Sequence, residues 1–171
     1  MDSFLQLAHD RYSCRKFSDK PVEKEKLDQI IEAALISPTA VNYQPEHLFI
    51  LHGDDAQKKI SEATRYTFGA KTFIVLGIQD TIAWNRATDG KYFGDVDAGI
   101  VGASILFAVK DLGLDSTFVG YFDPEVMKKN FPAMEDYDLI GIFPIGYAHS
   151  DSKPYPQHFK KNPIDSMVTE L

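Results

Sequence analysis

The chain has 171 residues, of which 44% are hydrophobic and 25% charged, a composition typical of one globular domain spanning residues 1–171. A formal charge of −7 argues against a general nucleic-acid-binding surface, and no apolar run approaches the roughly 20 residues that span a bilayer. Cys14 is the only cysteine, which excludes an internal disulfide, and the chain starts without a basic leader, so we expect a cytoplasmic protein without a signal peptide.

Two helices are expected in the first part of the chain. Ser3 and Gln6 form a capping-box pattern, which predicts a short helix ending near Arg11. A longer helix is expected to open at Pro21 and to stop at Ser37, because the residue before a proline avoids helical geometry. Its buried face is predicted from apolar residues at helical spacing, namely Leu27, Ile30, Ile31, Ala34 and Leu35.

The middle of the chain predicts strands that alternate with helices. Residues 48–51 are a strand candidate, and a helix is expected over 54–64. Residues 73–78 form a β-branched apolar run that is too short for a buried helix and predicts a central strand. Residues 97–112 are apolar nearly all round, which is typical of a helix in the core or at a subunit interface.

The last part of the chain adds two strand candidates, at 117–119 and 139–143, and a short helix after Asp123-Pro124. Together these elements predict one α+β domain, in which several helices pack on a sheet of about four or five strands. The C-terminal tail, about 149–171, contains prolines and few aliphatic residues, so we expect it to run extended over a surface. Its far end can be anchored on another subunit by Ile164, Met167 and Val168.

Several familiar site motifs are absent. The sequence has no P-loop, no G-x-G-x-x-G after a strand and no G-x-S-x-G elbow, and its five histidines never pair at metal-ligand spacing. We therefore expect no metal site. Cys14 is a candidate nucleophile because Arg15 beside it can lower its pKa, and the alternative is a small buried filler.

Two polar segments are candidate parts of a site. Arg11, Ser13 and Arg15 follow the first helix, and in a turn their side chains could converge on one anion, since arginine offers a planar fork of donors to phosphate. The alternative is a solvated basic patch at the end of a helix. Residues 37–45 are rich in small and polar residues, and taken alone they predict a loop.

In this order and spacing the two segments resemble the FMN-dependent nitroreductase family. The R-x-S-x-R/K-x-F motif of that family is matched at Arg11, Ser13, Arg15 and Phe17. The S-P-S/T-x-x-N-x-Q-P-W motif is matched at Ser37, Pro38, Thr39, Asn42, Gln44 and Pro45.

Further stretches extend the resemblance over essentially the whole chain. Residues 97–108 are similar to the long central helix of the family, which forms much of its dimer interface. Residues 112–114 and 119–123 resemble a G-L-x…E-G-F-D stretch, and residues 146–147 with 160–164 resemble a G-Y…R-K-P-L ending.

The resemblance implies a nitroreductase-like α+β fold, with a central, mostly antiparallel sheet flanked by helices, in a domain-exchanged homodimer that binds FMN. The implied phosphate and ribityl site comprises Arg11, Tyr12, Ser13 and Arg15, assisted by Lys160 or Lys161. The residues implied to reach the same flavin from the second subunit are Thr39, Ala40, Asn42 and Gln44. The backbone of Val119 and Gly120 is implied to lie near flavin N5, and Arg15 or Lys71 is a candidate positive group near N1 and O2.

The sequence departs from the family pattern in three places. Glu46 replaces the tryptophan after Q-P, and Val119 replaces the glutamate before the flavin-contacting glycine. The insertion before the central helix is short, at 79–96, and its aromatic residues are candidate pocket walls or ordinary packing residues. These aromatic residues are Trp84, Tyr92 and Phe93.

The implied function is that of an oxidoreductase in which FMN passes electrons from NADH or NADPH to an electron-poor acceptor, such as a nitroaromatic or a quinone, by a ping-pong mechanism. No side chain is nominated as a catalytic acid or base, and no nucleic-acid or membrane partner is expected. Three alternatives stay open: a specialised enzyme of the same fold, such as a dehalogenase, an enoate reductase or a flavin-consuming enzyme; a non-catalytic or carrier-fed flavin protein; and a cofactor-free interaction domain.

Overall fold

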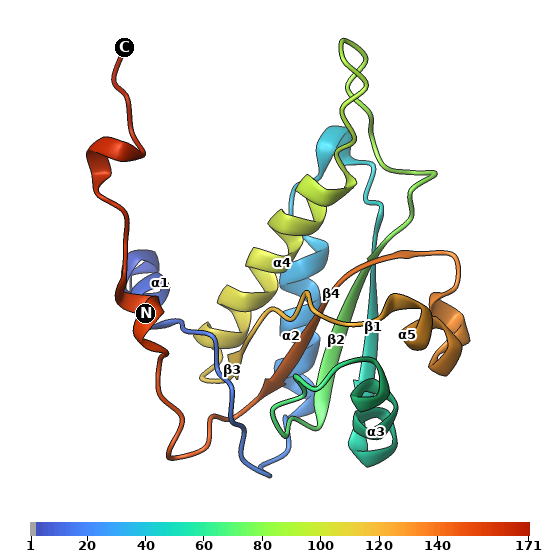
Figure 1. Cartoon of the computed structure of the whole chain (residues 1–171), viewed down its shortest axis with the longest axis vertical. Coiled ribbons are helices and arrows are strands. Elements are labelled where there is room, and N and C mark those ends of the chain that lie inside the picture. The colour runs from blue at the N-terminus through green and yellow to red at the C-terminus, as the bar shows by residue number, and fades with distance from the viewer. Residues whose placement is uncertain (1–2) are drawn as a thin grey trace.

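One antiparallel sheet of four strands organises the molecule, for which a computed structural model describes residues 3–171. The strands lie in the order β1-β2-β4-β3 (Figure 1). Their bounds are β1 (Glu46–His52), β2 (Thr72–Ile78), β3 (Asp115–Ser116) and β4 (Asp138–Gly146). All of β2 is buried between β1 and β4, which confirms the expected central strand and the α+β fold class.

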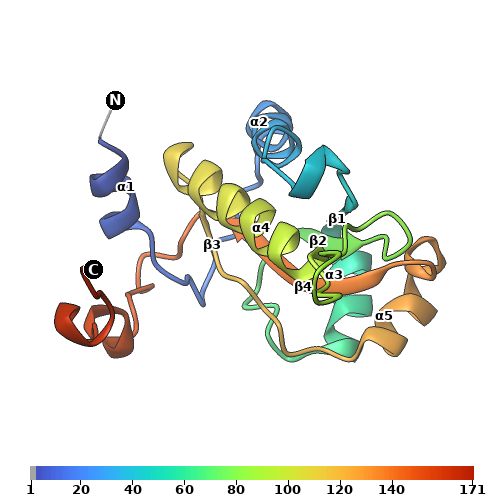
Figure 2. The same cartoon turned by 90° about the horizontal axis from the view of Figure 1, so that it is seen from above.

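Helices cover both faces of this sheet. Their bounds are α1 (Phe4–Asp10), α2 (Lys24–Leu35), α3 (Gly53–Ala63), α4 (Gly94–Asp111) and α5 (Pro124–Asn130). Figure 2 shows α2 and α4 on one face, with α3 and α5 on the other. Ile74 and Leu76 of β2 belong to the same buried cluster as residues of α2 and α4, whereas Phe73 and Val75 pack with residues of α3 and α5. Because side chains alternate along a strand, β2 contributes residues to both buried clusters. Burial of each side chain of this size stabilises the folded state by about 1.5–3 kcal/mol.

The predicted caps are confirmed. The Ser3 hydroxyl accepts a hydrogen bond from the backbone N–H of Gln6 at the start of α1. The Asp123 carboxylate accepts from the N–H groups of Glu125 and Val126 at the start of α5, with a proline in the first helical turn. These side chains satisfy donors that a helix leaves unpaired at its N-terminus.

Several element boundaries differ from the sequence prediction, among them the start of α4 at Gly94 instead of Asp97. Helix α2 starts at Lys24 and not at Pro21, because Glu23, its N-cap, has extended backbone angles. The strand predicted at 117–119 is wrong, since β3 ends at Ser116 and only Val119 makes an isolated bridge to Ile142. Phe118, between Ser116 and Val119, is exposed, and its ring packs against Phe143 and over Gly141. Aromatic packing, and not strand pairing, therefore holds the backbone of this segment.

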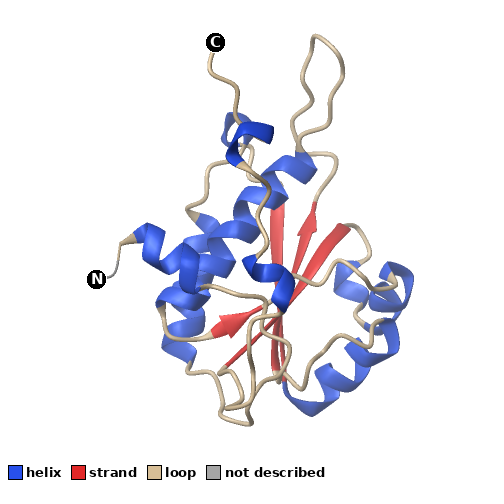
Figure 3. Cartoon of the chain, turned by 60° about the vertical axis from the view of Figure 1, so that its left-hand side comes forward, coloured by secondary structure: helices blue, strands red, loops and turns tan. Residues whose placement is uncertain are grey.

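The ends of the fold lie outside the sheet. After β4 the chain passes close to its own N-terminal part, where Ala148 bridges Phe17, and the tail continues on the side of α1 (Figures 1 and 2). The tail contains two short 3-10 turns, at Pro156–Phe159 and Ile164–Ser166, and its residues 159–171 are all exposed. Figure 3 shows the loop before α4 projecting beyond the end of the sheet. Within residues 3–171, no helix has the length and apolarity needed to cross a lipid bilayer.

Candidate functional site

The segment with the two arginines is extended and not a turn. Ser13 pairs in parallel with Ser116 of β3, and the N–H of Cys14 donates to the carbonyl of Ser116 at 3.0 Å. Because side chains alternate along extended backbone, Arg11, Ser13 and Arg15 share one side of the segment. By this alternation Ser13 and Arg15 can face one site, whereas Arg11 is not among the residues that line the polar cavity.

The other side of this segment is tied to the start of the tail. The Tyr12 hydroxyl donates to the Ser152 hydroxyl at 3.2 Å, and the Cys14 thiol lies 3.3 Å from the same oxygen. Burial raises the pKa of Tyr12, so its phenol stays protonated and remains a donor. Cys14 is fully buried, which supports the filler role over the nucleophile. Ser152 thus holds the start of the tail on the side of the segment opposite Ser13 and Arg15.

A polar cavity lies on the arginine side. It has a volume of about 230 Å³ and is lined by Ser13, Arg15, Tyr155, Gln157 and His158. The Arg15 guanidinium lies 5.6 Å from the centroid of the Tyr155 ring, and neither arginine of the segment forms an ion pair within residues 3–171. The neighbouring Lys16, by contrast, is paired with Asp151 at 2.9 Å. The cavity therefore offers unpaired cationic and neutral donors to an anion.

A second, aromatic cavity adjoins the first, since Arg15 lines both. Its volume is about 410 Å³, and it is lined by Arg15, Tyr66, Phe68, Thr117, Phe118, Val119, Gly120 and Tyr121. The Tyr66 ring stands edge-on to Tyr121, with centroids 5.9 Å apart and planes at 79°. Phe68 has a φ of +54°, a strained value that tertiary packing must hold. Such walls suit a planar aromatic ligand.

The backbone of Val119 and Gly120 borders this cavity. The N–H of Val119 donates to the Ile142 carbonyl at 2.8 Å and is therefore engaged. The N–H of Gly120 finds no acceptor in the part of the chain that the structure describes. A Cβ at Gly120 would lie 3.2 Å from the Phe118 ring, so the space there is already tight. Of the two residues predicted at this point, Gly120 is the one able to offer a backbone donor.

Arg65, which no sequence motif singles out, contacts Tyr66 of the aromatic cavity but does not itself line that cavity. The Nη2 atom of Arg65 donates to the Tyr66 hydroxyl at 2.8 Å, and its guanidinium lies 5.0 Å from the centroid of the same ring. Arg65 makes no ion pair with a carboxylate of residues 3–171. It is therefore a free positive group beside the walls where Lys71 was expected to act.

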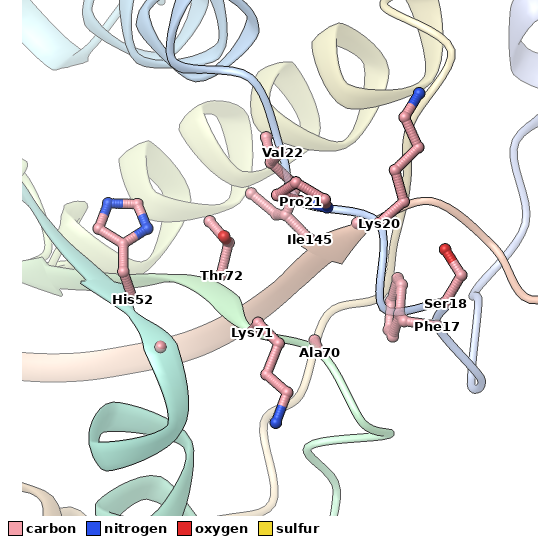
Figure 4. Close-up of a pocket in the computed structure, with 12 residues that line it drawn as sticks. Phe17, Ser18, Lys20, Pro21, Val22, His52, Ala70, Lys71, Thr72 and Ile145 are labelled. Atoms are coloured by element: carbon pink, nitrogen blue, oxygen red, sulfur yellow. The ribbon is translucent and has the colours of Figure 1, made fainter.

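Lys71 lies at a different cavity, of about 270 Å³, shown in Figure 4. Its ammonium group is bound by Asp54 and Gln57. The Lys20 ammonium lies 3.6 Å from the centroid of the Tyr147 ring, and Figure 4 shows both lysine side chains pointing away from the cavity. The rest of the lining is mainly the apolar surface of Phe17, Val22 and Ile145.

The predicted loop over 39–44 does not line either Arg15 cavity of its own chain. Its backbone is unusual, because Val41, Asn42 and Gln44 have φ values of 56°, 58° and 51°, in the left-handed region. The loop is held by a bond from the N–H of Ala40 to the Asp97 carboxylate at 2.8 Å and by a bond from the N–H of Gln44 to the Thr39 hydroxyl at 3.0 Å.

The remaining predicted residues are not among those that line the two Arg15 cavities. Lys160 and Lys161 are exposed just after the tail turn that lines the polar cavity, and no ion pair forms with either in the described chain. Trp84 and Phe93 pack edge-on with centroids 4.8 Å apart, and the Tyr92 hydroxyl donates to Asp80. These contacts favour the packing interpretation of the three aromatic residues of the 79–96 insertion.

Known proteins share this fold. The profile of the Nitroreductase family matches residues 8–68 and 65–147. A crystal structure of a nitroreductase family protein from Clostridium difficile 630 is similar, with a TM-score of 0.90 and 32% identity over 98% of each chain. A relative from Archaeoglobus fulgidus, provisionally named NADH dehydrogenase/NAD(P)H nitroreductase, is 27% identical over 95% of each chain.

A third comparison concerns the fold alone. A crystal structure from Desulfovibrio desulfuricans, described as a nitroreductase-type protein in complex with FMN, has a TM-score of 0.80 and 21% identity. It is matched over 100% of this chain and 98% of that chain. The profile match covers most of the sequence, including both polar segments that carried the resemblance. The chain belongs to the nitroreductase family.

Proposed function

We propose that this protein is an FMN-dependent oxidoreductase that passes electrons from NADH or NADPH to a small electron-poor acceptor. One observation carries the proposal: Arg15, which has no carboxylate partner in residues 3–171, stands where a polar cavity meets an aromatic one. FMN has the same two parts, a phosphate at one end and a planar ring system at the other. The names of the Archaeoglobus and Desulfovibrio proteins agree with this assignment.

The polar cavity fits the phosphate end. Ser13 and Arg15 supply a hydroxyl and a planar fork of donors, and Gln157 and His158 supply further polar groups from the tail. Arg11 lies on the same side of the extended segment, and Lys160 and Lys161 follow the turn that closes the cavity. These cations concentrate positive charge locally, although the whole chain carries a net charge of −7.

The aromatic cavity fits the ring end. Tyr66 and Tyr121 provide apolar walls, and the free N–H of Gly120 can donate to a ring nitrogen. Arg65, beside Tyr66, can stabilise negative charge on the ring. When bound, FMN supplies the hydride and electron chemistry, so the residues of this chain need only bind, orient and exclude water.

We also propose a homodimer. A groove of about 540 Å³ between α1, α2 and α4 is largely apolar and includes Phe4, Ile36 and Phe107. Phe4 is 64% and Ile36 77% exposed in the single chain, which is unusual for large apolar residues that lie next to one another. A second copy would cover this groove. It would also explain why the 39–44 loop lines neither Arg15 cavity of its own chain, since the loop can complete the flavin site of the partner.

Initial-rate kinetics test the proposed activity. With NADH or NADPH varied against a quinone or a nitroaromatic, we expect parallel double-reciprocal lines, because the two substrates take turns at one cavity. Intersecting lines would contradict the ping-pong scheme. No oxidation of either nicotinamide, by a protein that retains FMN, would instead favour a carrier-fed flavin protein, and consumption of the flavin itself would favour a specialised enzyme of the same fold.

A further inference from the structure

A chain of hydrogen bonds ties the start of the tail to residues 12–16. The Tyr12 hydroxyl donates to Oγ of Ser152 at 3.2 Å, and the same oxygen lies 3.3 Å from Sγ of Cys14. The Cys14 thiol donates to the carbonyl of Lys16 at 3.3 Å. Because a thiol has one hydrogen, the Ser152 hydroxyl is the donor to the sulfur. Each hydroxyl and thiol hydrogen of the chain is therefore used, and Ser152 lies at its centre.

The tail contacts the 12–16 segment on both of its sides. Tyr12 and Cys14 contact the tail through Ser152, whereas Ser13 and Arg15, in the alternate positions, line the polar cavity. The tail residues that line this cavity with them are Tyr155, Gln157 and His158. The segment is thus held between the start of the tail and the turn that follows.

A short and stiff connection joins the two contacts. Only Lys153 and Pro154 lie between Ser152 and the first tail residue of the cavity, Tyr155, and Pro156 follows directly. Each proline fixes its own φ at about −65° and restricts the residue before it to extended backbone. The position of Ser152 therefore limits where the cavity-lining part of the tail can lie.

Ser152 is also the last anchor of the tail. Beyond it, every hydrogen bond that the tail forms within residues 3–171 joins one tail residue to another. Before it, the N–H of His149 donates to the Lys16 carbonyl at 3.0 Å, and the Asp151 carboxylate pairs with the Lys16 ammonium at 2.9 Å. That ion pair is exposed on both sides, so it contributes little. The hydroxyl of Ser152 is therefore the group best placed to hold the rest of the tail.

We propose that the Ser152 hydroxyl positions the tail residues of the polar cavity, so that docking of the tail and binding of an anion at Arg15 strengthen one another. Ser152 does not line the cavity, so it is a positioning residue. An anion that bridges Arg15 and the tail stabilises the docked tail by the same factor by which docking strengthens the binding of the anion. The inference rests on the proposed function only for the identity of this anion, the phosphate of FMN.

Limited proteolysis of the flavin-free protein tests the anchor. Chymotrypsin can cleave after Phe159 only when the Pro156–Phe159 turn is extended, so the rate of cleavage follows the population of the released tail. We expect Ser152→Ala to be cleaved about fivefold to tenfold faster than the parent, as the loss of one or two hydrogen bonds implies. Ser152→Thr keeps the hydroxyl and should be cleaved as slowly as the parent. Equal rates for the parent and Ser152→Ala would overturn the anchor.

Two further variants make this result specific. Asp151→Asn weakens the exposed ion pair next to Ser152 and should be cleaved within about twofold of the parent rate. Tyr12→Phe removes one hydrogen bond of the chain and should speed cleavage by a smaller factor than Ser152→Ala. In the Ser152→Ala background the same substitution should add little, because its partner is already missing. Fully additive effects of the two substitutions would contradict a shared chain.

Ligand titrations test the link between the anchor and the cavity. Ser152→Ala should bind FMN more weakly than the parent, by up to the factor found in proteolysis, and Ser152→Thr should bind it as the parent does. Riboflavin lacks the phosphate and should bind all three proteins alike. Equal affinity of Ser152→Ala and the parent for FMN would overturn the positioning role of Ser152.

The protein without flavin separates this inference from the proposed function. A parent that binds no FMN would contradict the proposed function, whereas the proteolysis would still show whether Ser152 holds the tail. Inorganic phosphate then serves as the probe, and it should slow cleavage after Phe159 more than sodium chloride of equal ionic strength does. No such slowing would overturn the link to an anion. A parent that binds and uses FMN, without any difference from Ser152→Ala in cleavage or affinity, would refute the positioning role alone.

Discussion

Arg15 connects the two cavities of the proposed flavin site, and its guanidinium has no acidic partner in the described chain. In Arg15→Ala we expect the affinity for FMN to fall about tenfold to a hundredfold, because a hydrogen bond to a charged group is worth about 1.5–3 kcal/mol. Quenching of flavin fluorescence during titration measures this affinity.

Two controls make the Arg15 result specific. Riboflavin lacks the phosphate, so its affinity should change little in Arg15→Ala. Lys16 is the next residue, but it is paired with Asp151 at the surface, so Lys16→Ala should bind FMN as the parent does. An equal loss for FMN and riboflavin would place Arg15 away from the phosphate.

Gly141 is a second residue whose replacement we expect to disturb the packing beside the aromatic cavity. A Cβ there would lie 2.5 Å from the Phe118 ring, which lines the aromatic cavity. Gly141→Ala should lower the free energy of unfolding by about 1–3 kcal/mol, as expected for overpacking, measured by urea denaturation. In a Phe118→Ala background the same substitution should cost little, and an undiminished cost would show that the ring is not the obstacle.

Among the elements, those with a long regular pattern were predicted from the sequence. The apolar repeat of α2, the all-round apolar surface of α4 and the β-branched run of β2 each reflect burial that the sequence itself displays. Short elements were not predicted as well. The exposed Phe118 looked like part of a strand, although its ring packs over the bare backbone of Gly141, a contact between distant residues that no local pattern encodes.

The residues of the site also differ in whether the sequence predicts them. Ser13 and Arg15 belong to a motif and were predicted, and they do line one cavity. Tyr66, Gln157 and His158 lie in loops or in a short 3-10 turn without periodicity, so only the folded chain brings them to Arg15. Gly120 was named from the resemblance together with Val119, but the sequence could not show that the N–H of Val119 is engaged by the Ile142 carbonyl.

The tail is the element whose removal is most informative. It contributes Tyr155, Gln157 and His158 to the polar cavity but no residue to either buried cluster. A chain ending at Ser152 should keep the circular dichroism spectrum of the parent and lose most of its affinity for FMN. Full affinity in the shortened protein would contradict a tail-closed phosphate site.

For the whole molecule, the main expectation is assembly through the groove between α1, α2 and α4. Sedimentation equilibrium should give a dimer for the parent. Ile36→Glu should give a monomer with reduced flavin content, because it places a charge on a large exposed apolar residue of that groove. Ser61→Glu adds the same charge at an exposed site on α3 and should remain dimeric. A monomeric parent would remove the proposed role of the 39–44 loop.

The path of the electrons through the flavin decides the function of the whole molecule. The most direct measurement is the visible absorption spectrum of the FMN-loaded protein, mixed under anaerobic conditions with NADH and, separately, with NADPH. At least one nicotinamide should bleach the flavin band, and an added quinone or nitroaromatic should restore it. A flavin band left unchanged by both nicotinamides would contradict the proposed oxidoreductase.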